Sequence, residues 1–182
     1  IFIKGGHNLE NALAAAAAGW VMDINSEELK KTLSTFPGVA HRLERVLTHN
    51  GVEYVNDSKG TNPDASIKAL EAYDNPIILI AGGKNKGSDF LPFAEKINEK
   101  VKALILLGQA AGEIEAAVKK FGYDSIYHAG NYPEAVETAT SLAVNGDVVL
   151  LSPACASWDM FRNYEERGDL FKELVKQAAK KL

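Results

Sequence analysis

The sequence predicts an α/β fold in which a mostly parallel, Rossmann-like sheet carries helices on both faces. Three uninterrupted apolar runs, 77–81, 103–107 and 148–151, have the length and composition of strands that are buried on both sides. Helical patterns separate these runs, and strands that alternate with helices are typical of parallel sheets. An Asn-Gly pair between two further strand-like runs predicts an antiparallel hairpin at the N-terminal edge of the sheet.

Two helices are predicted ahead of the sheet. The first spans 8–20, because Asn8 is a good N-cap and the alanine run behind it has high helix propensity, while Gly19 is expected to end or strain the helix. The second spans 26–36, with Ser26 as its N-cap. Pro37-Gly38 then breaks the chain and is the predicted boundary between a helical segment, 1–36, and an α/β domain, 37–182.

The elements of the predicted α/β domain begin with the hairpin. Its two strand-like runs lie within 42–57 and meet at His49-Asn50-Gly51. Pro63, behind Asn62 as N-cap, marks the first turn of the next helix. The predicted order is then helix 63–73, strand 77–81, helix 89–100, strand 103–107, helix 110–121, a weaker strand near 125–128, helix 132–144, strand 148–151 and helix 165–181.

The composition predicts a soluble globular protein and bears on its partners. With 182 residues, 46% of them hydrophobic, the chain is long enough for one domain, or for one domain and a fragment of another. The net charge of -4 gives no electrostatic reason to expect nucleic acid or an anionic membrane as a partner. No apolar run approaches the roughly 20 residues that span a bilayer. We therefore expect neither nucleic acid nor a membrane as a partner. We also expect the protein to be a monomer.

The single cysteine and the start of the chain carry further expectations. Cys155 alone excludes an internal disulfide and every multi-cysteine metal site, so a cytoplasmic location is predicted. The four histidines show no metal-ligand spacing, and no metal site built by this chain alone is expected. The N-terminus lacks the basic start of a signal peptide. Because the chain begins without Met inside what resembles an ordered segment, we expect it to be part of a longer protein.

Ligands of parallel sheets bind beyond the carboxyl ends of the strands, and the stretch 56–66 (NDSKGTNPDAS) is the first polar loop predicted there. The side chains in it that suit a phosphate, a carboxylate, a ribose or a metal are those of Asp57, Ser58, Lys59 and Thr61. A strand-to-helix turn capped by Asn62 explains the same stretch equally well, so both interpretations stay open. The helix N-terminus attracts anions in either case.

Two more polar loops follow the strands 77–81 and 148–151. In 82–90 (GGKNKGSDF) the glycines let the backbone approach a ligand and Lys84 and Lys86 offer charge, although a glycine turn with solvent-exposed lysines is an equal alternative. The phosphate-binding pattern G-x-x-x-x-G-K-[ST] is absent from the chain. In 152–168 (SPACASWDMFRNYEERG) small residues lead into a helix start, where N–H groups and the Ser157 hydroxyl suit a carboxylate. Cys155 is not expected to be a nucleophile, because no histidine base is placed near it.

A fourth segment, 7–11 (HNLEN), places Asn8 and Asn11 one turn apart at a helix start. Two amides on one helix face can contact the edge of a nucleotide base, although N-capping alone would explain Asn8. The sequence of this segment leaves both interpretations open.

Together these segments resemble the C-terminal part of a Mur ligase. The patterns, in order along nearly the whole chain, are GxHNxxNxxAA, HRxE, NDSKxTN, GGxxKxxDF and LLSPACASxDMFxxxxxRG. NDSKxTN and SPACASxD are typical of the family members that add D-glutamate, whereas HNxxN and HR are shared across the wider Mur and folylpolyglutamate ligase superfamily. The chain departs from the usual pattern at Gly60, where Ala is frequent, and at Trp158 and Tyr164, where Phe or Leu is common.

The resemblance implies part of a three-domain ligase that uses ATP and Mg2+. Residues 1–36 would be the tail of the central ATPase domain, and 37–182 the complete C-terminal amino-acid-binding domain. The reaction implied is amide formation, in which UDP-N-acetylmuramoyl-L-alanine is activated by ATP as an acyl-phosphate and D-glutamate attacks it. The phosphate-binding loop and the magnesium ligands would lie upstream, so this chain alone is expected to hold no cofactor, to contain no catalytic residue and to be inactive.

The resemblance also assigns residues of this chain to two ligands. The positions that match D-glutamate contacts are Thr61, Lys86, Ser157, Trp158 and Tyr164, with Lys86 expected to pair with a carboxylate. The positions that match nucleotide contacts are Asn8 and Asn11 for adenine, and Arg42, Asp57, Ser58 and Lys59 for the phosphates and ribose. Two other functions stay open: a ligase of the same superfamily that adds another amino acid, and a non-catalytic module that binds a nucleotide or an amino acid.

Overall fold

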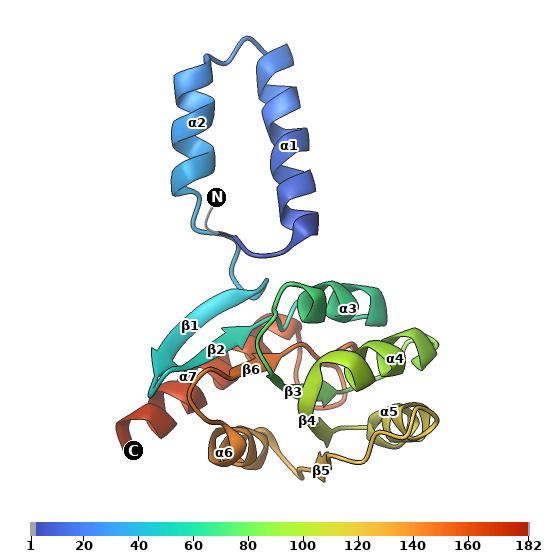
Figure 1. Cartoon of the computed structure of the whole chain (residues 1–182). Helices are drawn as coiled ribbons and strands as arrows, with labels where there is room; N and C mark the ends of the chain where they lie inside the picture. The colour runs from blue at the N-terminus through green and yellow to red at the C-terminus, as the bar shows by residue number, and fades with distance from the viewer. Residues whose placement is uncertain (1–2, 182) are drawn as a thin grey trace.

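Six strands form one sheet in the computed structural model, which describes residues 3–181 (Figure 1). The strands are β1 (Glu44–His49), β2 (Val52–Asn56), β3 (Ile77–Gly82), β4 (Val101–Leu107), β5 (Ile126–His128) and β6 (Val148–Leu151). They lie in the order β1-β2-β6-β3-β4-β5, and each neighbouring pair is parallel except β1 with β2. The predicted fold class, including the antiparallel hairpin at the edge, is therefore confirmed.

Seven helices accompany the sheet in the described part of the chain. They are α1 (Gly6–Val21), α2 (Ser26–Thr35), α3 (Pro63–Glu71), α4 (Leu91–Lys100), α5 (Ala111–Lys119), α6 (Tyr132–Leu142) and α7 (Tyr164–Lys181). In Figure 1, α3, α4 and α5 lie on one side of the sheet and α6 and α7 on the other. The predicted helices and strands are all present, and their ends move by at most two residues.

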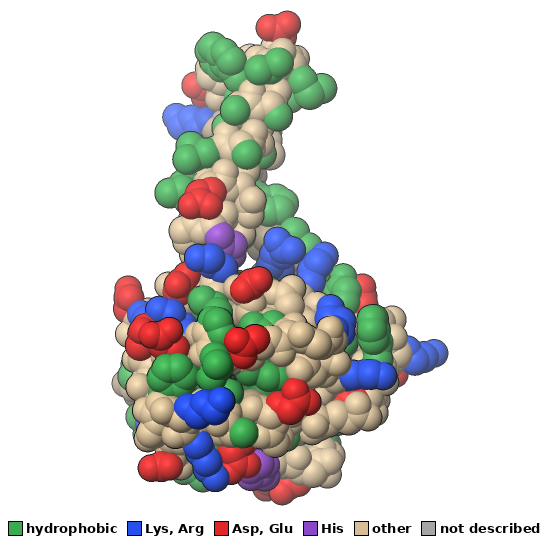
Figure 2. Space-filling view, turned by 90° about the vertical axis from the view of Figure 1, so that its right-hand side faces the viewer, with side chains coloured by type: hydrophobic (Ala, Val, Ile, Leu, Met, Phe, Trp, Pro, Cys, Tyr) green, Lys and Arg blue, Asp and Glu red, His purple; other side chains and the backbone are tan. Residues whose placement is uncertain are grey.

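The helical pair α1–α2 projects away from the sheet as a stalk (Figures 1 and 2). Large apolar side chains gather on it, and those of Leu13, Trp20, Val21 and Met22 are between 62% and 81% exposed. Apolar surface of this extent is typical of regions that contact another part of a protein. Among residues 3–181, none of the helices combines the length and the apolarity that crossing a bilayer requires.

The start of α1 differs from the prediction. Its N-cap is Gly5, whose φ of 98° suits glycine, so the proposed N-cap role of Asn8 is wrong. Asn8 lies inside the helix, where its Nδ2 donates to the carbonyl oxygen of Lys4 at 2.6 Å. Gly19 does not end the helix either. A Cβ at that position would lie 2.6 Å from Cδ2 of Leu29, so glycine allows α1 and α2 to pack closely.

Of the caps predicted for the next two helices, one is wrong and one is confirmed. Asn25 caps α2, not the predicted Ser26, because Oδ1 of Asn25 accepts from the N–H of Glu28 at 3.0 Å. Asn62 caps α3 as predicted, through a hydrogen bond from the N–H of Ala65 at 2.9 Å.

The hairpin turn follows its sequence signal. Asn50 and Gly51 have φ values of 49° and 75°. Positive φ at both central residues is the type I′ geometry that an Asn-Gly pair favours, and it matches the twist of the two strands.

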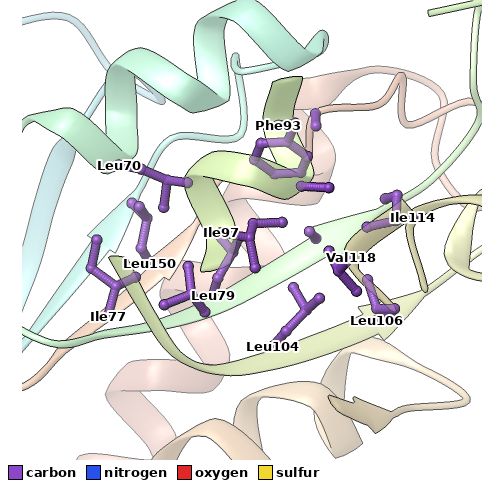
Figure 3. Packing of buried hydrophobic residues seen from close by; sticks show 14 of the residues in the cluster. Leu70, Ile77, Leu79, Phe93, Ile97, Leu104, Leu106, Ile114, Val118 and Leu150 are labelled. Atoms are coloured by element: carbon purple, nitrogen blue, oxygen red, sulfur yellow. The ribbon is translucent and has the colours of Figure 1, made fainter. Parts of the chain in front are cut away.

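Two apolar cores fill the spaces between the sheet and its helices. Successive residues of β3 enter opposite cores, which explains why the whole strand is apolar. Figure 3 shows one core, in which Phe93 and Ile97 of α4 pack over Leu79 and Leu104 of the sheet. These two packed layers hold the carboxyl ends of the strands in place.

Candidate functional site

The insertion of β6 between β2 and β3 creates a switch point at one edge of the sheet. The chain leaves β3 toward α4 on one face and leaves β6 toward α7 on the other face. Ligands of open α/β sheets bind in the crevice outside the carboxyl ends of strands at such a point. Because β2, β6 and β3 are parallel neighbours, the three polar loops predicted from the sequence all begin at this edge.

The loops after β3 and β6 are joined through their backbones. Lys84 and Ala156 each donate an N–H to the carbonyl oxygen of the other, at 2.8 and 3.0 Å, and the N–H of Gly82 donates to the oxygen of Pro153 at 2.9 Å. A Cβ on Gly83 would collide with the carbonyl oxygen of Ala156. The glycines therefore allow the two loops to approach each other. That they also let the backbone approach a ligand stays a prediction.

Lys86 lies at the exposed tip of the loop after β3, which Asn85 closes. Oδ1 of Asn85 accepts from the N–H of Ser88 at 2.8 Å, and its Nδ2 donates to the carboxylate of Glu113 at 2.7 Å. A side-chain amide that bonds its own backbone in this way fixes the turn. Lys86 therefore lies in a turn whose conformation is fixed by hydrogen bonds of Asn85.

Arg167 fastens the loop after β2 to the loop after β6. Its side chain is fully buried, and Nε and Nη2 donate to Oγ and the carbonyl oxygen of Ser58 at 2.9 and 2.7 Å. Nη1 donates to the carbonyl oxygen of Cys155 at 3.1 Å. Oγ of Ser58 in turn donates to the carbonyl oxygen of Tyr164 at 2.8 Å. No role was predicted for Arg167 from the sequence, although it is the next-to-last residue of the final quoted pattern.

Asp57 is a buried carboxylate in the loop after β2. Its Oδ2 accepts from Oγ of Ser152 at 2.7 Å, and its Oδ1 accepts from the N–H of Leu43 at 3.2 Å. Oγ of Ser152 also lies 2.8 Å from Oγ of Ser66 on α3. Burial raises the pKa of the Asp57 carboxyl to about 6, although these hydrogen bonds and the charge of Arg42 act in the opposite direction. The group is therefore ionised at neutral pH, but its burial makes the ionised form less favourable than it is in water.

The HRxE pattern has a structural explanation around Asn56. Nδ2 of Asn56 lies 3.1 Å from Nδ1 of His41 and donates to the carboxylate of Glu44 at 3.0 Å. A Cβ at Gly168 would collide with the ring of His41, so glycine leaves room for this cluster. Arg42, between His41 and Glu44, is exposed and lies at the edge formed by the carboxyl ends of β2, β6 and β3.

One small hollow, here called the Ser157 pocket, brings together all five residues that the resemblance assigned to D-glutamate. Its volume is about 190 Å³, and its lining consists of Thr61, Lys86, Ala156, Ser157, Trp158, Asn163, Tyr164 and Glu165. Ser157 is buried beneath it, whereas the side chain of Trp158 is exposed. α7 begins at Tyr164, so the N-terminus of this helix lies beside a lysine and two hydroxyl groups, and Asn163 caps it by accepting from the N–H of Glu166 at 2.8 Å. This arrangement suits a small carboxylate-bearing ligand.

A second hollow, here called the Lys59 cleft, lies next to the first. Its volume is about 160 Å³, and it is lined by His7, Arg42, Asp57, Lys59, Gly60, Ala65 and Lys68. Three cationic side chains against one carboxylate, at the start of α3, suit a phosphoryl group. The pKa of His7 is lowered by burial and then by the charges of Arg42 and Lys68. Three of the six predicted nucleotide residues, Arg42, Asp57 and Lys59, line this cleft.

The other three predicted nucleotide residues lie outside the Lys59 cleft. Asn8 is buried and lines a larger groove of about 650 Å³ between the base of the stalk and the β1–β2 hairpin, which Arg42 also lines. Asn11 is exposed on α1. Ser58 is fully buried, and its hydroxyl proton goes to Tyr164, so its observed contacts join parts of the site.

Sequence reasoning missed two residues of the Lys59 cleft, His7 and Lys68. Lys68 lies one turn beyond Ala65 on α3, so helical spacing from the polar loop is a signal that could have found it. His7 was visible only as part of the HNLEN segment, and its place in the cleft depends on how α1 meets the sheet.

Two expectations about chemistry bear on this edge. Cys155 is buried, and burial raises the pKa of its thiol to about 12, which supports the view that it is not a nucleophile. In the described part of the chain, no group of three or more His, Cys, Asp or Glu side chains is placed to hold a metal ion.

Comparisons with known proteins show which family the chain resembles. Residues 41–155 match the family model for the Mur ligase, glutamate ligase domain. A UDP-N-acetylmuramoylalanine–D-glutamate ligase from Pelotomaculum thermopropionicum is 62% identical over 173 residues, which are 95% of this chain and 38% of that protein. The ligase of the same name from Clostridioides difficile is 51% identical over 175 residues, 96% of this chain and 39% of that protein. The chain thus spans about two fifths of the length of these relatives.

Solved structures share the fold at much lower identity. A UDP-N-acetylmuramate-alanine ligase from Thermotoga maritima superposes with a TM-score of 0.72 at 18% identity, over 97% of this chain and 39% of that one. A folylpolyglutamate synthase from Mycobacterium tuberculosis, solved with ADP, gives 0.70 at 17% identity, over 93% of this chain and 41% of that one. Both likenesses include the helical pair as well as the sheet, since they cover nearly the whole chain.

Proposed function

The chain belongs to the Mur ligase family, and from this membership we propose that it is the C-terminal part of an ATP-dependent ligase that adds D-glutamate. The acceptor would be UDP-N-acetylmuramoyl-L-alanine, activated as an acyl-phosphate, in the synthesis of peptidoglycan precursors. The observation that carries the proposal is the Ser157 pocket, where five residues matched by resemblance to D-glutamate contacts line one hollow. Relatives at 51–62% identity that carry the name of this ligase support it.

The pocket suits the chemistry of D-glutamate. Its Lys86 would pair with one carboxylate, and the hydroxyl groups of Thr61 and Ser157 would donate hydrogen bonds. Backbone N–H groups at Trp158 and at the start of α7 would add donors, so these two positions tolerate different side chains. A rigid pocket of this kind would hold the amine in place for attack, and positioning of this kind is a large part of catalysis.

The Lys59 cleft is the proposed place where the nucleotide meets this chain. Arg42 and Lys59 would contact the phosphates and Asp57 the ribose, and the excess of cations in the cleft supports a phosphoryl ligand. Asn8 and Asn11 would contact the adenine, and Ser58 would act by holding the Lys59 loop. ATP would supply the phosphoryl group that activates the acceptor. Mg2+ and the catalytic residues would be held by the rest of the longer protein, and this chain alone would be inactive.

We also propose how the chain is divided and where it works. Residues 1–36 would be the tail of the central ATPase domain and 37–182 the C-terminal domain, which accounts for the exposed apolar side chains of the stalk. An enzyme that consumes ATP and a UDP-linked acceptor would work in the cytoplasm. We propose a monomer without nucleic acid or membrane as a partner, in keeping with the net charge of -4.

The test is Lys86→Ala in the longer ligase that carries this chain. Loss of one charged hydrogen-bond partner is expected to raise the apparent KM for D-glutamate by about 10- to 100-fold, with little change for ATP. Lys84→Ala is the matched control, because Lys84 belongs to the same loop, is also exposed and lines neither hollow. An effect confined to ATP, or an equal effect of both substitutions, would overturn the assignment. Activity with L-lysine or L-glutamate in preference to D-glutamate would instead favour a relative that adds another amino acid.

A further inference from the structure

The Ser157 pocket and the Lys59 cleft lie on two sides of one loop and share a wall. Lys59 and Gly60 line the cleft, whereas the next residue, Thr61, lines the pocket. Tyr164 also lines the pocket, and Nζ of Lys59 lies 5.5 Å from the centroid of its ring. The ammonium group of Lys59 and the ring of Tyr164 therefore lie where the linings of the two hollows meet.

The backbone of Tyr164 and the loop that carries Lys59 are held relative to each other by Ser58. Oγ of Ser58 donates to the carbonyl oxygen of Tyr164 at 2.8 Å, and Ser58 directly precedes Lys59 in the chain. Arg167 fixes both Oγ and the carbonyl oxygen of Ser58. The ring of His41 meets the ring of Tyr164 edge-on, with centroids 5.8 Å apart. Because Ser58, Arg167 and His41 are buried, this network fixes the backbone of Tyr164 beside Lys59, and the edge-on contact with His41 supports the orientation of the ring.

An aromatic partner leaves the charge of the lysine available to ligands. The face of an aromatic ring attracts an ammonium group within about 6 Å of its centroid, yet the ring carries no net charge. A carboxylate at the same place would neutralise the lysine and repel anions on both sides. Among residues 3–181, no carboxylate forms an ion pair with Lys59.

We propose that Tyr164 is a positioning residue that holds the ammonium group of Lys59 in the wall between the two hollows, where one cation serves both an acidic amino acid in the Ser157 pocket and a phosphoryl group in the Lys59 cleft. The identity of the amino acid rests on the proposed function. Two anions on opposite sides of a thin wall repel each other, and a cation between them reduces this repulsion. The ring therefore favours phosphoryl binding in a cleft that it does not line, and this effect passes through Lys59.

The test is the affinity of the 182-residue chain for inorganic pyrophosphate, followed by the NMR shifts of the backbone amides. Tyr164→Leu removes the ring and is expected to raise the Kd for pyrophosphate by about two- to fivefold, the range for a cation–π contact at a partly exposed site. Tyr164→Phe keeps the ring and is expected to leave the Kd unchanged. The amide spectrum itself shows whether each variant is folded. In the longer ligase that carries this chain, ADP should give the same ratio between variants, because only its phosphoryl groups would meet Lys59.

A double-mutant cycle separates the proposal from a loss of local order. In a Lys59→Met background, Tyr164→Leu should have no further effect on pyrophosphate binding. A persistent effect in that background, or no effect of Tyr164→Leu on the original chain, would overturn the proposal. Titration with D-glutamate tests the proposed function separately. If D-glutamate leaves the amides of Thr61 and Ser157 unmoved while the pyrophosphate result holds, the proposed substrate is wrong and the role of Tyr164 stands.

Discussion

Replacing Asp57 by asparagine is expected to stabilise the folded chain at neutral pH. Burial raises the pKa of this carboxyl from its ordinary value of 3.8 to about 6. The difference of about 2.2, at about 1.36 kcal/mol per pKa unit, corresponds to about 3 kcal/mol of stability that ionisation removes. The pKa of about 6 already includes the hydrogen bonds from Ser152 and Leu43, which favour the ionised carboxyl. Asparagine has nearly the shape of the protonated acid: its oxygen can accept from the N–H of Leu43 while its amide group donates to Oγ of Ser152. The net gain expected above pH 7 is therefore about 3 kcal/mol.

The sign of the effect follows from where the proton binds. Between about pH 4 and pH 6 the folded chain binds a proton at Asp57 that the unfolded chain has already released. The contribution of the protonated group to stability is therefore full below about pH 4 and is lost as the pH rises through about 6. Asp57→Asn, which cannot ionise, should match the stability of the original chain within about 1 kcal/mol near pH 4 and be the more stable of the two above pH 7.

The measurement is urea unfolding followed by far-UV circular dichroism at several pH values from 4 to 8. Asp74→Asn is the control, because the side chain of Asp74 is fully exposed and the same change there should alter the free energy of unfolding by less than about 0.5 kcal/mol. The reasoning is refuted if the difference between Asp57→Asn and the original chain does not change with pH. It is also refuted if the original chain is the more stable of the two at pH 7.5.

Two further predictions concern buried groups near the site. Arg167→Met should lower the free energy of unfolding by about 3–5 kcal/mol, because three hydrogen bonds from a buried charge are lost. The stability of Arg167→Lys should lie between those of the original chain and Arg167→Met. Urea unfolding measures both variants, and a loss below about 1 kcal/mol for Arg167→Met would contradict this account. The Cys155 thiol, with a pKa raised to about 12, should react with a disulfide reagent far more slowly in the native chain than in urea, and equal rates would show that it is not buried.

The sequence predicted the elements and the hairpin at the edge, but not the order of the strands within the sheet. Strands 77–81 and 148–151 were clear because both are apolar throughout, and the Asn-Gly pair fixed the hairpin. The predicted cap at Asn8 was wrong because α1 already begins at Gly6, behind Gly5. The predicted cap at Ser26 was wrong by one residue. Asn25 and Ser26 are both good caps in adjacent positions, and propensity alone does not rank them.

From the residues alone the site was predicted as a set of loops, and the resemblance then grouped five of their residues around one ligand. The fold shows how these loops come together. Thr61, Lys86 and Ser157 belong to three different loops, and the insertion of β6 between β2 and β3 places them in one pocket. The role of Arg167 could not be predicted from spacing, because its partner Ser58 lies 109 residues away. Such a contact depends on the packing of α7 against the sheet.

Two buried charges of opposite sign, Asp57 in the loop after β2 and Arg167 beside that loop, do not form an ion pair with each other. Asp57 bonds to Ser152 and Leu43, whereas Arg167 bonds to the neutral oxygens of Ser58 and Cys155. Burying an ion against neutral partners leaves part of the desolvation penalty uncompensated, so neither arrangement is the most stable that the fold allows. The stability expected from Asp57→Asn measures this penalty for one of the two charges. If the same variant gains stability and also loses affinity for ADP, the buried carboxylate is retained for the ligand and not for the fold.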